Sequence, residues 1–436
     1  SPFTVIATSP PPPQPAMSYT EATLGADAAA GPGASGQPPP PPAAGGDAAA
    51  GGGNDAASEA ETAIAVSGTA AADEVEVPPP PAPVAGSGPS ERRRARVQLP
   101  QHEEDEGPTY FRIGIDHTYE PGDEEIHFQC ARIKKLENLE AAGARLRKLC
   151  LIANCVEKIE NLESVINLEH LELYQNLVKK IENIQHLKNL TVLDLSFNKI
   201  RSSASLGSCQ FEKLERLYLS SNKITDIEGV FHFRELRLLE LGSNRIRGIP
   251  PAIGDLSKLQ ELWLGRNKIT SMALPPMPAL RHLSLQNNRL EVWDPSLFHN
   301  ASALTHLYLG HNNLPDMPEE FALLTELVEV DLVKNAITTI RPVPQMEKLE
   351  ELWLNDNQIT DLSEVRHLAA FPALQTVYLE RNPMHGQGNA ESEAKYKEAI
   401  LQAVPGLKQL DALRLYTTVK VVTDGSEKNV VGIRKA

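Results

Sequence analysis

Acidic and aromatic side chains recur in this 436-residue chain at one fixed place, between the two apolar residues of a short L-x-L motif. The acids at this place are Glu172, Asp194, Glu240 and Asp331, and the rings are Tyr218, Trp263, Tyr308, Trp353 and Tyr378. Neither Lys nor Arg occupies it in any copy. Carboxylates pair with basic side chains, and Trp and Tyr dominate the energetics of interfaces. The pattern therefore favours a surface that binds another protein.

Catalytic chemistry finds little support in the same sequence. It contains no G-x-S-x-G elbow, no Walker loop and no H-E-x-x-H pair. The histidines are scattered, and we expect His282 and His306, beside strand positions, to be solvated. The four cysteines fit neither a disulfide framework nor a zinc site, so we expect them to be core or neutral residues. We predict a protein that is not an enzyme and needs no cofactor or metal.

The L-x-L motifs belong to a longer repeat, L-x-L-x-x-N, with a period of 21 to 25 residues. Its asparagines are Asn154, Asn176, Asn198, Asn222, Asn244, Asn267, Asn288, Asn312, Asn335, Asn357 and Asn382. One degenerate copy precedes them at 126–128, with Ala131 in the asparagine position. Units of this length stack on their neighbours, because none can bury its apolar face alone. The sequence predicts about twelve stacked units.

The unit's residue types predict its shape. Leu239 and Leu241 alternate on a short strand and point inward, so Glu240 points outward. The buried asparagine bonds backbone groups of adjacent turns that would otherwise lack partners. Roughly ten residues remain for the return path, which suits turns or 3₁₀ segments. We predict an α/β repeat solenoid, a leucine-rich-repeat arc with parallel concave strands, thin convex connections and a C-terminal helical cap.

Composition divides the chain into four segments. Residues 1–107 are rich in Ala, Gly and Pro, and we expect a disordered acidic tail. The solenoid is predicted over 108–393. A cap follows over 394–413, where Tyr396, Ile400, Leu401 and Val404 fall on one helical face. The last segment, 414–436, is a tail with a weak hairpin expected around residues 424–425.

Charge and hydropathy limit the partners. The formal net charge is -15, and residues 1–91 carry ten acids and no Lys or Arg, which leaves about -5 (-15 minus -10) from Arg92 onward. We therefore expect no nucleic-acid partner. No apolar run of 18 residues occurs, so we expect no membrane span and an intracellular protein, a monomer until its partner binds. The arginines at 92–94 and 96 are read as a solvated basic run or a nuclear-import patch.

With these residues in hand, the region from about 126 to 413 resembles the leucine-rich-repeat regulatory subunit of protein phosphatase 1, the regulatory subunit 7 type. The stretches that carry the resemblance are LELGSNRIR (239–247), LGRNKIT (264–270), ELWLNDNQI (351–359), TVYLERNP (376–383) and LKQLDA (407–412). The rungs over 248–329 depart from the strict repeat of that family. The Ala/Pro/Gly tail has no counterpart in the family.

The resemblance implies a scaffold that holds the phosphatase catalytic subunit on its concave face and governs its activity, maturation or location in nucleus and cytoplasm. Any catalytic metals would belong to that partner. The family's contact residues match here at Asp194, Glu240, Asp331, Glu351, Trp353 and Tyr378, while Tyr218 and Trp263 replace family phenylalanines. Splicing-factor and axonemal-dynein relatives share the repeat and the cap, so a different protein partner on the same face is the alternative.

Overall fold

The computed structural model describes residues 109–386, 389–423 and 426–433, which all belong to the compact unit Val97–Ala436. The expected disordered tail, residues 1–107, lies outside the described residues.

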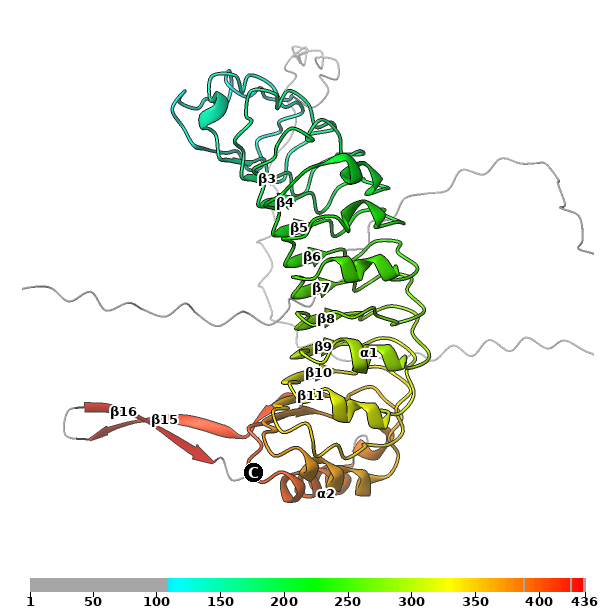
Figure 1. Ribbon diagram of the computed structural model, residues 1–436. Helices are drawn as coiled ribbons and strands as arrows, with labels where there is room; N and C mark the ends of the chain where they lie inside the picture. The colour runs from blue at the N-terminus through cyan, green and yellow to red at the C-terminus, as the bar shows by residue number, and fades with distance from the viewer. Residues whose placement is uncertain (1–108, 387–388, 424–425, 434–436) are drawn as a thin grey trace, which may run out of the picture. The chain divides into compact units, whose positions relative to one another are not determined.

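Short strands, one in each repeat, stack in chain order into a single sheet (Figure 1). They are β1 Glu125–His127, β2 Lys148–Cys150, β3 His170–Glu172, β4 Val192–Asp194, β5 Arg216–Tyr218, β6 Leu238–Glu240, β7 Glu261–Trp263, β8 His282–Ser284, β9 His306–Tyr308, β10 Glu329–Asp331, β11 Glu351–Trp353, β12 Thr376–Tyr378, β13 Gln409–Leu410 and β14 Leu413–Arg414. Neighbours from β1 to β13 pair in parallel, and β14 is antiparallel to β13. The solenoid prediction, including its twelve repeat strands, is confirmed.

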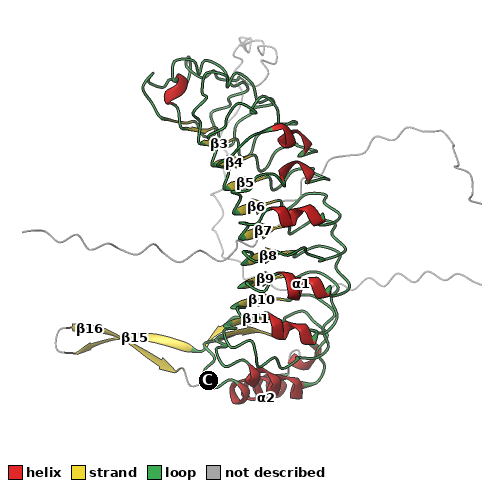
Figure 2. Ribbon diagram, in the orientation of Figure 1, coloured by secondary structure: helices red, strands yellow, loops and turns green. Residues whose placement is uncertain are grey.

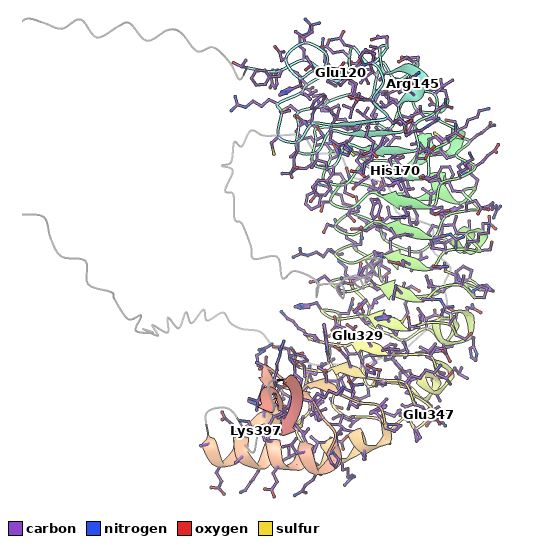
Figure 3. The ribbon with its side chains drawn as sticks, turned by 90° about the vertical axis from the view of Figure 1, so that its left-hand side faces the viewer. Glu120, Arg145, His170, Glu329, Glu347 and Lys397 are labelled. Carbon is purple, nitrogen blue, oxygen red and sulfur yellow. The ribbon has the colours of Figure 1, made fainter. Side chains whose placement is uncertain are left out.

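Each repeat places its template leucines in a continuous core. Leu239 and Leu241 have no solvent exposure, and the same holds for the equivalent leucines of the neighbouring repeats. Figure 3 shows the stack curving toward its strands, with Glu329 on the strand side and Glu347 on the side where the chain returns. The strands therefore line the concave face, as the alternation of side chains requires.

The repeat asparagines form the expected ladder. Oδ1 of Asn244 accepts a hydrogen bond from the Ile224 N–H at 2.9 Å, and its amide donates to the carbonyl oxygens of Leu219 and Leu241 at 2.9 and 3.0 Å. The residue before each asparagine adopts a left-handed backbone, for example Ser243 with φ 55°. These bonds stabilise a turn that costs a non-glycine residue roughly 1 kcal/mol.

The return side carries the thin connections that the repeat length predicts (Figure 2). Its 3₁₀ segments are η1 Gly143–Arg145, η2 Ala204–Ser208, η3 Glu228–Val230, η4 Pro251–Asp255, η5 Glu319–Leu323, η6 Leu362–Ala370 and η7 Pro383–His385. One repeat instead holds a short α-helix, α1 Pro295–Asn300. It forms because the Asp294 side chain caps the Ser296 N–H and Pro295 is preset for a first helical turn.

A helix closes the C-terminal end of the core. This helix, α2 Ala390–Ala403, buries Tyr396 and Ile400. It begins four residues before the expected start at 394, because the Asn389 side chain accepts hydrogen bonds from the N–H groups of Glu391 and Ser392. Beyond the cap, β15 Tyr416–Thr423 and β16 Ser426–Ile433 pair antiparallel around residues 424–425, which lie outside the described residues. No helix in the described segments is long and apolar enough to cross a membrane.

Candidate functional site

The residues between the paired leucines form one row along the concave face, which we call the central row. Strand pairing sets each member directly beside the next: Glu172, Asp194, Tyr218, Glu240, Trp263, Ser284, Tyr308, Asp331, Trp353 and Tyr378. All of them except Ser284 are partly exposed, whereas the leucines on either side are buried. The structure thus brings together nine of the ten predicted contact residues in a single line.

Glu351, the tenth predicted contact residue, lies in a parallel line that we call the flanking row. It sits on β11 two residues before Trp353, and its strand neighbours are Glu329 and Thr376. Both rows face the hollow because side chains two apart on a strand share one side of the sheet.

The rings of the central row pack against each other in pairs. The centroids of Trp263 and Tyr308 lie 5.8 Å apart with nearly parallel planes, 21° apart. They reach across β8 because the residue between them, Ser284, is small and only 1% exposed. Trp353 and Tyr378 meet edge to face at 5.8 Å. Packing between rungs explains part of the ring pattern, and each ring keeps an exposed portion that a partner can cover.

Burial perturbs the carboxylates of the concave face. It raises the pKa of Asp194 to about 6, although the Ser196 N–H donates to Oδ1 at 2.8 Å and opposes the shift. It likewise raises the pKa of Asp331 to about 6, against a similar bond from the Val333 N–H. These two carboxylates are therefore costly to ionise while the face remains without a cationic partner.

Glu329 is an acid of the flanking row that the sequence pattern had not indicated as a contact residue. Burial, followed by the charge of the neighbouring Glu351, raises its pKa to about 7. The signal that could have found it is the period of two along the strand, since the residue before each L-x-L motif also faces the hollow.

His282 and His306, which we expected to be solvated, are only partly exposed. They lie beside each other in the flanking row, with side chains 31% and 28% exposed and ring centroids 4.3 Å apart. Burial lowers the pKa of both. Each lies 3.9 Å from a carboxylate, Glu261 for His282 and Glu329 for His306. Within the described ranges, no group of three or more His, Cys, Asp or Glu side chains is arranged to hold a metal ion.

Three polar atoms of this face lack hydrogen-bond partners among the described residues. The indole N–H of Trp353 and the Nδ1 atoms of His170 and His282 are buried without a hydrogen bond. A buried donor without an acceptor costs about 1–3 kcal/mol, so an acceptor supplied from outside would stabilise Trp353 in place. By contrast, Cys150 on β2, the strand neighbour of Glu172, donates its thiol hydrogen to Oε2 of Glu172 at 3.0 Å.

Comparison with known proteins agrees with this architecture. Two family models match the chain, "Leucine rich repeat" at residues 234–290 and 278–337, and "Leucine Rich repeats (2 copies)" at 166–208, 188–232 and 325–367. In solved structures, the fold is similar to an internalin of Listeria monocytogenes (22% identity, TM-score 0.56), over 66% of this chain and 79% of that one. Together with the sheet and the asparagine ladder, these matches make the chain a leucine-rich-repeat protein.

Individual relatives match over short stretches. The human Cilia- and flagella-associated protein 410 is 33% identical over 88 residues, which are 20% of this chain and 33% of the relative. The Leucine-rich repeat-containing protein 51 of Macaca mulatta is 32% identical over 113 residues, 24% of this chain and 56% of the relative. The chain thus spans about a third and about half of their respective lengths.

Proposed function

We propose that this leucine-rich-repeat protein is a non-catalytic scaffold that binds the catalytic subunit of protein phosphatase 1 on its concave face. The scaffold regulates the activity, maturation or location of that subunit in nucleus and cytoplasm. The observation that carries the proposal is the central row, in which carboxylates and rings stand in register with no Lys or Arg among them. The resemblance of the motifs around Glu240, Glu351 and Tyr378 to the phosphatase regulator supports this choice of partner.

The physical state of this face supports a partner with cationic and hydrogen-bond-accepting groups. Asp194 and Asp331 are partly buried acids with raised pKa values, and a partner's Lys or Arg would offset the cost of their charge. Trp353 offers a buried N–H without an acceptor and a partly exposed ring. A ring of this kind, once covered, contributes on the order of 2 kcal/mol to binding.

The test is titration of the purified full chain with the purified phosphatase catalytic subunit. Glu351→Ala and Trp353→Ala are each expected to weaken the complex by roughly tenfold or more, as hot-spot truncations do. Glu347→Ala is the matched control, because Glu347 is an exposed acid on the return side in Figure 3. Equal affinities for wild type and all three variants, or no complex at all, would end the proposal.

A second candidate partner comes from the repeat and cap that splicing-factor and axonemal-dynein relatives share with this chain, and the match to the human Cilia- and flagella-associated protein 410 is compatible with its ciliary form. In this alternative, the same concave face holds a component of the axonemal-dynein or splicing machinery. Affinity purification of the full chain from cells, followed by mass spectrometry, separates the candidates. If wild type recovers the phosphatase and Trp353→Ala does not, the phosphatase is the favoured partner. If wild type recovers axonemal or splicing proteins and Trp353→Ala does not, the alternative is favoured.

A further inference from the structure

A second charged surface lies outside the concave face, where each rung turns around its buried asparagine. In each rung three residues face outward there: the residue before the asparagine, and the first and third residues after it. The second residue after the asparagine is buried. Over the rungs of β4 to β8 these positions hold eight basic residues, Lys199, Arg201, Lys223, Arg245, Arg247, Arg266, Lys268 and Arg289. Glu291 is the one acid at these positions of the five rungs. We call this surface the basic edge.

Backbone hydrogen bonds hold the basic edge in a row. The N–H of Lys223 donates to the carbonyl oxygen of Ile200, the residue after Lys199, at 2.8 Å. The same bond joins Arg245 to Ile224 at 2.9 Å, and it recurs from Lys268 to Ile246 and from Arg289 to Ile269 at 2.8 and 2.9 Å. Five consecutive rungs therefore present a cation at the same position, at the spacing of parallel strands, about 5 Å.

The cations of the basic edge are not paired with acidic side chains within the described part of the chain. None of the eight forms an ion pair there, whereas lysines elsewhere do. Lys258 lies 2.6 Å from Glu235, and Lys348 lies 2.6 Å from Glu326. Like charges one rung apart repel each other by a few tenths of a kcal/mol to about 1 kcal/mol each. An anion laid along the edge would relieve that repulsion.

We propose that the basic edge binds an extended acidic peptide segment of a protein partner, running across the rungs from β4 to β8. Five rungs span roughly 20 Å, which matches about six residues of extended chain. This surface is separate from the concave face and opposite in charge, so it is independent of the phosphatase proposal. It gives the scaffold a second docking position.

A peptide fits the edge better than a nucleic acid does. Surfaces that bind single strands repeat aromatic side chains on which successive bases stack. Among the outward positions of these five rungs Phe197 is the one ring, 39% exposed at one end of the row. The net charge of about -5 (-15 minus -10) from Arg92 onward also repels a long polyanion more than a short acidic segment.

The experiment measures fluorescence anisotropy of a labelled decapeptide of alternating Glu and Ser, titrated with the full chain at low and physiological ionic strength. The test variant is Lys223→Gln, Arg245→Gln and Lys268→Gln combined. The matched control is Lys258→Gln, Lys348→Gln and Lys395→Gln, which removes the same charge from lysines paired with Glu235, Glu326 and Glu391. A ten-nucleotide single-stranded RNA is the competing probe.

We expect wild type to bind the peptide more weakly as the salt concentration rises. Affinity should fall about tenfold in the test variant, because each lost ion pair reduces it by a factor of about two to three. In the control variant it should change by less than about twofold. Unchanged thermal unfolding of both variants shows that the fold is kept. The proposal is overturned if the peptide does not bind wild type, if both variants lose affinity equally, or if RNA binds more tightly than the peptide.

Discussion

The hydroxyl of Tyr396 donates a hydrogen bond to Oδ2 of Asp411 at 2.8 Å and so links the cap helix α2 to the turn that directly follows β13, the last parallel strand of the sheet. The other carboxylate oxygen, Oδ1, accepts from the N–H groups of Leu379 and Glu380 at 2.7 and 2.9 Å. Asp411 thus satisfies backbone donors of the preceding rung as a ladder asparagine does, and it also binds the helix that covers the core. The burial of Tyr396 and the nearby Asp411 charge raise the pKa of its hydroxyl.

Removing the Asp411 carboxylate should destabilise the C-terminal end. We expect Asp411→Ala to lower the free energy of unfolding by about 2–4 kcal/mol, because one buried N–H group, one partly buried N–H group and one buried hydroxyl lose their acceptor. Asp411→Asn keeps an oxygen for the backbone and should cost less than half as much. Urea denaturation compares the variants, and equal losses in both would show that the carboxylate does not bind the backbone as described.

The internal ladder should be equally sensitive. Asn244→Leu is expected to cost roughly 1–3 kcal/mol, since the Ile224 N–H and the Leu219 carbonyl lose their partner inside the solenoid. Asn313→Leu is the matched control, because Asn313 follows a ladder asparagine but is exposed. Its cost should stay within about 0.5 kcal/mol. Urea midpoints that fall equally in both variants would contradict a buried role for Asn244.

Particular residues show how far the sequence could predict this protein. The period of the asparagines predicted the strands and the ladder, because a buried amide in each turn is a local requirement that every rung repeats. The same rule placed Glu240 and Trp353 on the concave face. It could not give the contact between Trp263 and Tyr308, which depends on Ser284 being small on the strand between them. The start of α2 was also missed, because the cap at Asn389 lies in a polar stretch without helical periodicity.

The contact between Trp263 and Tyr308 should depend on the size of Ser284, the residue between them. A ring at position 284 has to occupy the space where those two rings meet, so Ser284→Phe should push them apart and expose more of Trp263. We expect a red shift of tryptophan fluorescence and weaker binding of the concave partner. Ser284→Ala is the control, because it keeps the gap and should leave both readouts near those of wild type. A wild-type spectrum for Ser284→Phe would show that the rings do not depend on this gap.

The raised pKa of Asp331 makes the stability of the fold depend on pH. Burial raises its pKa from the usual 3.8 to about 6 in the folded chain. Between these two pH values the folded state therefore holds a proton that the unfolded state has already released. This contribution to stability is fully present below pH 3.8 and is lost as the pH rises through about 6. In Asp331→Asn the group does not titrate. Relative to that variant, wild type should lose about 1–3 kcal/mol of unfolding free energy between pH 4 and 7.

The measurement is urea denaturation of both chains at several pH values across that window, at constant ionic strength. Because all other titrating groups are shared, the difference between the two curves isolates Asp331. The same acid should bind a cationic partner more tightly as it ionises, so the affinity of the concave face should rise over the interval in which stability falls. A difference between the curves that does not change with pH would mean that Asp331 is solvated. In that case its ionisation in the folded state would cost no extra free energy that a cationic partner could offset.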